Sequence, residues 1–170
     1  MMKKMRNKQK GETKMTINSK MDNYFSKHYD EKQLVDRYRI SFETMWLTFV
    51  LILISGMIKI FHGPWAAANT EMIILLSLPA TYFIIRSVMK SAYFSRTEKS
   101  YTWTLIIFAA IGILNLATII IIALGGDPFI ENGILTENLF QFFIALPLLS
   151  IPITYLIKKA ISKDVKENEE

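Results

Sequence analysis

The polar side chains inside the apolar parts of this chain form no recognisable catalytic or metal-binding motif. Ser55, Ser77 and Ser150 lie in apolar stretches, where a serine nucleophile would need a neighbouring base, and the sequence places none in those stretches. His28 and His62 are 34 residues apart and fall on opposite sides of the membrane that the apolar stretches predict. Cysteine is absent, which excludes disulfides and thiol catalysis. We therefore expect a protein that is not an enzyme and that has no cofactor and no metal site.

Four charged residues near the ends of two apolar stretches could pair with one another. Glu43 and Lys59 bracket the first stretch, and Glu71 and Arg86 bracket the second. In an antiparallel helical hairpin, Glu43 would meet Arg86 at one end and Lys59 would meet Glu71 at the other. A functional interpretation makes one pair a proton or ion site. The interpretation that we favour is interfacial ion pairing that fixes the register of the hairpin.

A polar residue near the centre of the third stretch is a candidate for helix packing. Gly112 precedes Asn115 by one turn, and Thr118 follows it by one turn. Small residues let membrane helices approach closely, and a buried amide can then bond across the interface. Asn115, Gly112 and Thr118 are therefore candidates for a helix-packing or homo-oligomer contact, with a solute-binding role for Asn115 as the alternative.

Three prolines, Pro79, Pro147 and Pro152, fall inside the apolar stretches. Proline removes a backbone donor and kinks a helix, and a nearby Ser or Thr can bond to the carbonyl that is left free. The hydroxyls in range are those of Ser77, Thr81, Ser150 and Thr154. Bent helices could open a central cavity; the simpler interpretation is that prolines are common in membrane helices.

Four long apolar stretches must position all of these residues. A hydrocarbon core about 30 Å thick requires roughly 20 mostly apolar residues of helix, and lipid offers no hydrogen bonds to an irregular backbone. We predict an all-α polytopic membrane protein with four transmembrane helices. The stretches are Met45–Phe61, Met72–Met89, Tyr101–Leu124 and Leu139–Ile157.

Basic residues alternate between the segments that join these stretches. Cytoplasmic loops collect Lys and Arg, and four crossings put every basic segment on one side, with both termini cytoplasmic in the cell membrane. The same charges suit anionic inner-leaflet lipids; we expect no nucleic acid partner. Residues 1–41, Lys90, Arg96, Lys99 and the tail from Lys158 form the basic segments, whereas residues 62–71 and 125–138 contain no Lys or Arg.

An internal repeat suggests that the second and fourth stretches are related. Leu76–Arg86 and Leu149–Lys159 are offset by 73 residues and share Leu, Ser, Pro, Thr, Tyr and Ile at corresponding positions. Both stretches cross in the same direction, which predicts two similar tandem hairpins related by an axis along the membrane normal. The alternative is that Pro, Tyr and a basic end recur in many spans for interfacial reasons.

The remaining chain is polar and lies mostly before the first span. Asp30 and Gln33 resemble a capping box, and aromatic residues alternate with basic ones around them. An amphipathic juxtamembrane helix on the inner leaflet and a helix that merely packs on the bundle are both open. The predicted segments are a disordered basic arm (1–20), the juxtamembrane helix (21–41), a first hairpin (42–95), a second hairpin (96–160) and a charged cytoplasmic tail (161–170).

The region from Asp30 to Arg86 resembles small uncharacterised membrane proteins of low-GC Gram-positive bacteria. The matching residues are Asp30-Glu31-Lys32, Ile58-Lys59, Glu71-Met72-Ile73-Ile74-Leu75 and Tyr82-Phe83-Ile84-Ile85-Arg86. The resemblance covers about a third of the chain and implies a bacterial cell-membrane location and a four-span fold. It implies no activity.

These observations favour a non-enzymatic, membrane-embedded accessory or interaction protein. Its partners would be the lipid bilayer and either a second copy or another membrane protein. The alternative is a subunit of an oligomeric small-solute or ion transporter or channel, because four helices alone enclose little space. The spans contain no carboxylate well inside the membrane, which argues against proton-coupled export.

Overall fold

The computed structural model describes residues 29–94 and 101–167. These residues contain four α-helices: α2 (Glu31–His62), α3 (Ala68–Met89), α4 (Thr102–Gly125) and α5 (Phe140–Glu167). All four are long and apolar enough to cross a membrane. The prediction of a multi-pass, four-helix membrane protein is confirmed at this level. The basic arm (1–20), residues 21–28 of the predicted juxtamembrane helix and the last residues of the tail lie outside the described part of the chain.

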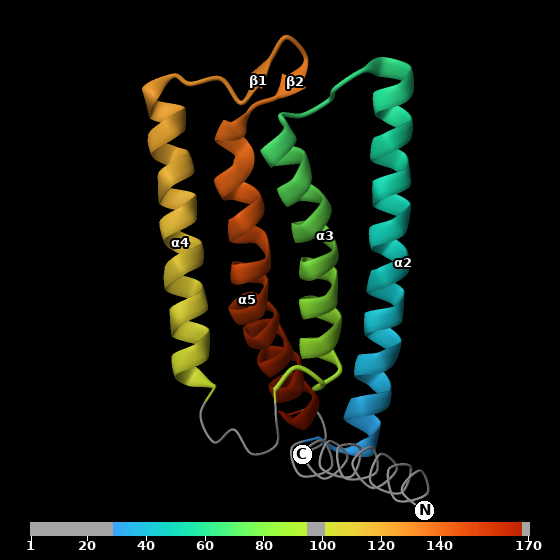
Figure 1. The fold of residues 1–170 in the computed structure, drawn as a ribbon. Coiled ribbons are helices and arrows are strands. Elements are labelled where there is room, and N and C mark those ends of the chain that lie inside the picture. Colours follow the sequence, from blue (N-terminus) through green and yellow to red (C-terminus); the bar gives the residue numbers. More distant parts are fainter. Residues whose placement is uncertain (1–28, 95–100, 168–170) are drawn as a thin grey trace, which may run out of the picture.

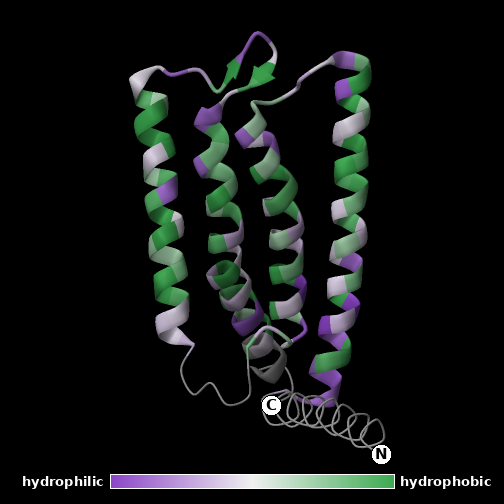
Figure 2. Ribbon diagram, viewed as in Figure 1, coloured by the Kyte–Doolittle hydropathy of each residue, from purple (hydrophilic) through white to green (hydrophobic). Residues whose placement is uncertain are grey.

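The helices stand side by side in a row, in the order α4, α5, α3, α2 (Figure 1). Helix α2 packs against α3, α3 against α5, and α5 against α4. Helices α3 and α5 run in the same direction and form the middle of the row. Apolar residues run along the lengths of the helices, and hydrophilic ones gather towards their ends (Figure 2). This distribution is the one that a hydrocarbon core imposes.

The first helix is longer than the span predicted for it. Asp30 and Gln33 form the capping box, and the Asp30 backbone N–H donates to Gln33 Oε1 (3.1 Å). Residues 31–41, which the sequence assigned to a juxtamembrane helix, are the first turns of α2 and continue into the span without a break. The helix ends at Gly63, whose φ of 82° suits a residue without a side chain.

The loop between α4 and α5 forms a small β-hairpin, and the loop between α2 and α3 bonds to it. We call this end of the helices the outer end and the opposite end, where α2 begins, the inner end. Strands β1 (Ile130–Glu131) and β2 (Ile134–Leu135) pair antiparallel around a turn at Asn132 and Gly133, both at positive φ. The segment before α3 adds to this hairpin: Ala66 bridges Leu135 in parallel. The short 3₁₀ turn η1 (Glu137–Leu139) then leads into α5. The two loops therefore hold the outer ends of α3 and α5 together.

Helices α3 and α5 continue across their prolines as single helices. Ser77 Oγ donates to the Ile74 carbonyl (3.4 Å), and Ser150 Oγ donates to the Pro147 carbonyl (2.8 Å). A proline frees the carbonyl four residues before it, which would be Leu75 for Pro79. The two serines therefore bond to neighbouring carbonyls and not to those that the prolines free, which are the carbonyls of Leu75, Phe143 and Leu148.

Helix α4 approaches α5 most closely at Gly112. A Cβ atom built on Gly112 would lie 2.6 Å from Cδ2 and Cγ of Leu149 and 3.5 Å from the Leu149 backbone nitrogen. Real side chains do not pack at 2.6 Å, so any larger residue would displace the Leu149 side chain or separate the helices. The glycine thus sets the distance between α4 and α5.

Replacing Gly112 with alanine should loosen the contact between α4 and α5. Overpacking of this kind typically costs about 1–3 kcal/mol, and we expect a matching loss in the free energy of unfolding, measured in detergent micelles. Gly56→Ala is the matched control, because nothing lies within 4 Å of a Cβ atom at Gly56; alanine in a helix interior should be neutral or slightly stabilising there. Equal losses in the two variants would contradict the close approach at Gly112.

Candidate functional site

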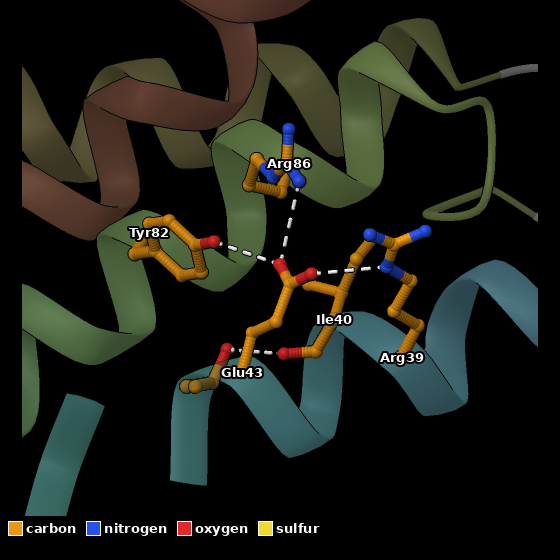
Figure 3. Close-up of polar contacts among 6 residues, drawn as sticks. Arg39, Ile40, Glu43, Tyr82 and Arg86 are labelled. Atoms are coloured by element: carbon orange, nitrogen blue, oxygen red, sulfur yellow. Dashed lines mark hydrogen bonds and ion pairs between the residues drawn. The ribbon is translucent and has the colours of Figure 1, made fainter. Parts of the chain in front are cut away.

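At the inner end of the α2–α3 pair, one carboxylate collects three donors. Glu43 Oε2 accepts from the Tyr82 hydroxyl (2.8 Å) and from a terminal nitrogen of Arg86 (3.4 Å). Glu43 Oε1 accepts from Arg39 Nε (3.1 Å), one turn earlier on α2. Figure 3 shows the three donors converging on this carboxylate from two helices. We call Arg39, Glu43, Tyr82 and Arg86 the inner cluster; its net charge is positive.

At the outer end of the same pair, a second carboxylate is more deeply buried. Glu71 Oε2 pairs with Lys59 Nζ (2.5 Å), and Glu71 Oε1 accepts from Ser55 Oγ (2.5 Å). Trp65 Nε1, from the loop between the helices, donates to Ser55 Oγ (3.0 Å). Glu71 is 7% exposed and Ser55 is 4% exposed. We call Ser55, Lys59, Trp65 and Glu71 the outer cluster.

The structure thus brings together both charge pairs that the sequence singled out. Glu43 lies beside Arg86 and Lys59 lies beside Glu71. The offset of sixteen residues along α2 matches that of fifteen along α3, so one register satisfies both pairs. Because one pair lies towards each end of the helices, the two ion pairs together stabilise the antiparallel packing of α2 against α3 in a single register.

The expectation that Ser55 has no base within reach is wrong. The Glu71 carboxylate belongs to the next helix and comes within hydrogen-bond distance of the Ser55 hydroxyl. The Ser55 oxygen already accepts from Trp65, and Lys59 holds the other oxygen of the carboxylate. Both oxygens of the Glu71 carboxylate and the Ser55 hydroxyl therefore have partners within the protein.

A turn at the inner end ties three helices together. Helix α3 ends with the Ala92 N–H bonded to the Ser87 carbonyl (2.8 Å) and the Ser91 N–H bonded to the Val88 carbonyl (3.1 Å), with Ser91 at a φ of 59°. This is a Schellman end, in which the αL position is usually glycine. Lys158 on α5 donates to the Val88 carbonyl (2.7 Å) and to Ser91 Oγ.

Helix α2 also bonds to this turn, because Gln33 Nε2 donates to the Ser91 carbonyl (2.7 Å).

The charge of Lys158 lies beside the last carbonyls of α3. A lysine at this position interacts favourably with the negative end of the helix dipole. The side chain of Lys158 therefore has a structural role in addition to its charge, and it links α5 to the end of α3.

Helices α3 and α5 both contain buried hydroxyl groups. Ser77, Ser150 and Thr154 are buried, at 3%, 8% and 6% exposure. Thr81 Oγ1 is also buried, and it has no hydrogen-bond partner among the described residues. These four residues occupy corresponding positions in the internal repeat. Small polar residues of this kind allow membrane helices to pack closely.

The candidate packing residues of α4 separate into different surroundings. Gly112 lies against α5. Asn115 Nδ2 donates to the Ile111 carbonyl of its own helix (2.8 Å), and Thr118 Oγ1 donates to the Leu114 carbonyl (3.0 Å). Both polar groups bond backward along α4 rather than across to α5. Within a single chain, the close helix contact therefore depends on the glycine and not on the amide.

Three residues that make these contacts were not singled out as site residues in the sequence. They are Trp65 of the outer cluster, Tyr82 of the inner cluster and Lys158, which bonds to the end of α3. Among the described residues, no group of three or more His, Asp or Glu side chains gathers to hold a metal. His28 lies outside the described part of the chain, and His62 is exposed at the end of α2.

Removing the charge of Glu71 should destabilise the protein more than removing that of Glu43. Glu71→Gln removes the charge from a buried carboxylate that accepts from Ser55 and pairs with Lys59, and we expect a loss of about 1–3 kcal/mol in the free energy of unfolding. Glu43→Gln is the matched control, since the Glu43 side chain is itself more exposed, at 27% against 9% for Glu71, and exposed ion pairs contribute little. Thermal or denaturant unfolding in micelles measures both; a larger loss for Glu43→Gln would contradict the assignment.

Comparison with known proteins supplies a family and no activity. No curated protein and no solved structure matches the chain. The model of a family of unknown function (DUF6773) matches residues 25–170, a range that includes all four helices and both polar clusters. The expected resemblance to an uncharacterised family is confirmed to that extent. Because the family model matches most of the chain, this protein belongs to the family of unknown function DUF6773.

Proposed function

We propose that this chain is a non-enzymatic interaction protein of the bacterial cell membrane. It would act through contacts of its helices with another membrane-embedded helix, and through its basic inner end with anionic lipids. The low-GC Gram-positive origin that the sequence resemblance implies is part of this proposal. An accessory role of this kind requires surfaces, and it requires no reactive group.

The main support is the open side of the helix row. Helices α2 and α4 each pack mainly against one neighbour, so most of their apolar surface is left for lipid or for a partner. Leu53 on α2 is 67% exposed, and Leu114 on α4 is 66% exposed. A closed bundle of four helices would bury more of these side chains. In this proposal, the row of helices packs against further helices in a larger membrane assembly.

The polar groups within the membrane favour a structural role. The outer cluster uses both oxygens of Glu71 and the hydroxyl of Ser55 in bonds to other residues. The inner cluster places Glu43 among three donors. A transport site would present such groups to a solute, whereas here they bind one another. Intramembrane ionisable groups that satisfy each other pin helices in register.

The orientation that we propose has both termini in the cytoplasm. The starts of α2 and α4 and the end of α5 carry or adjoin the basic segments, and the β1–β2 loop contains no Lys or Arg. Arg39, Lys90 and Lys159 are exposed at the basic end, where each would contribute about 1 kcal/mol of attraction to anionic lipid.

The two hairpins are proposed to be related by duplication. In support, α3 and α5 run parallel and pack against each other, and Thr81 and Thr154, which correspond in the two similar stretches, line the same groove. An axis along the membrane normal between α3 and α5 would relate α2–α3 to α4–α5.

Purified protein in liposomes should move neither cations nor a small cationic dye. We expect the flux of potassium and of ethidium to equal that of protein-free vesicles, because no described group offers a solute a coordination shell. The Glu71→Gln variant serves as a comparison, since disrupting the outer cluster should not change a flux that is absent. Flux above the protein-free level that is abolished by Glu71→Gln would replace the accessory role with the transporter alternative.

A further inference from the structure

A groove runs along one face of the middle of the row. Its volume is about 620 Å³, and its floor is α5, with α3 and α4 as walls. Ala145 and Ser150 belong to the floor, Ile85 to the α3 wall and Leu116 to the α4 wall. The lining is almost entirely apolar, as expected for a surface that faces hydrocarbon.

The length of the groove fits a helix better than a lipid chain. The floor extends from Phe142 to Ile157 along α5, which is about 22 Å at 1.5 Å per residue. One leaflet supplies acyl chains for only half of a core about 30 Å thick. A single acyl chain would therefore fill part of the groove, whereas a transmembrane helix would fill all of it.

The wall formed by α4 carries a seam suited to packing against a helix. Ile106, Ile113 and Ile120 are spaced by seven residues and are 50%, 59% and 59% exposed. Three residues after each isoleucine come Ala109, Leu116 and Ala123. Apolar residues in this heptad spacing form knobs-into-holes seams, and the alanines permit the close approach typical of membrane helices. Leu116 places this seam beside the groove.

The seam and the groove lie at the same depth. Gly112 of α4 faces Leu149 of α5, and the two helices run antiparallel. The floor of the groove extends from seven residues on the outer side of Leu149 to eight residues on its inner side along α5. At the same depths, α4 contains residues 104–119, counted from Gly112. Ile106, Ala109, Ile113 and Leu116 fall inside that range. A rotation axis along the membrane normal preserves depth, so it can bring the seam of one chain to the groove of another.

We propose that the occupant of the groove is α4 of a second copy of this chain, in a homodimer whose two-fold axis is parallel to the membrane normal. Each α4 lies over the α5 of the other chain, and the two seams meet at the axis. Such an interface is isologous, because the same surface serves both subunits. The dimer names the partner of the proposed interaction protein and so rests on that proposal.

The absence of cysteine makes the dimer accessible to single-cysteine cross-linking. Ile113→Cys lies at the centre of the seam, and Leu114→Cys is its matched control: the next residue, at nearly the same depth, 66% exposed and about 100° away around the helix. In vesicles of phosphatidylethanolamine and phosphatidylglycerol, we expect copper phenanthroline to give on the order of tenfold more disulfide-linked dimer for Ile113→Cys than for Leu114→Cys. A disulfide can form only between cysteines whose Cα atoms are close. The ratio of disulfide dimer between the two variants should stay the same when the protein is diluted with lipid.

A second pair of variants tests the interface without oxidation. Ile113→Trp should weaken dimerisation, measured by energy transfer between labelled chains, by about tenfold because it overpacks the seam. Leu114→Trp and Asn115→Leu, which alter other sides of α4, should leave dimerisation unchanged. Equal cross-linking at residues 113 and 114 that falls with lipid dilution, or loss of dimer only in Asn115→Leu, would overturn the proposal. Neither outcome alters the flux test, so failure of the dimer and failure of the accessory role are distinguishable.

Discussion

The interior of a bilayer contains no water, and this constraint explains where the polar groups of the protein lie. Backbone donors and acceptors must be satisfied by helices, and charged side chains must find partners or reach an interface. Glu71 and Glu43 do both: each lies towards one end of the α2–α3 contact and accepts several donors. Between these ends, the polar groups are mainly hydroxyls on α3 and α5.

The row arrangement follows from how these contacts are distributed. Two ion-pair clusters join α2 to α3, helix packing and the shared outer sheet join α3 to α5, and Gly112 sets the approach of α4 to α5. Lys158 adds a bond between α5 and the end of α3. Each contact joins neighbours in the row. The edges of the row and the groove over α5 are left to lipid or to other helices, which is why an interaction role suits this architecture.

Much of the helix architecture could be predicted from the sequence, because hydropathy and charge act over whole segments. The four spans and the partners of Glu43 and Lys59 follow from length and register alone. The contacts of individual side chains could not be predicted in this way. The Ser55–Glu71 bond depends on how two helices rotate against each other, and the backward bond of Asn115 depends on its rotamer. The joining of the two outer loops into a sheet needed the relative placement of α3 and α5, which no local pattern encodes.

The proposed contacts with lipid and with a partner depend on α2 to α5 crossing the bilayer four times, with both ends of the chain in the cytoplasm as we propose. Single cysteines at two exposed positions, Asp127→Cys before β1 and Lys159→Cys near the end of α5, test this directly in intact cells with a membrane-impermeant maleimide. The expected result is labelling of Asp127→Cys from outside and labelling of Lys159→Cys only after lysis. Labelling of Lys159→Cys in intact cells would contradict the four-crossing orientation.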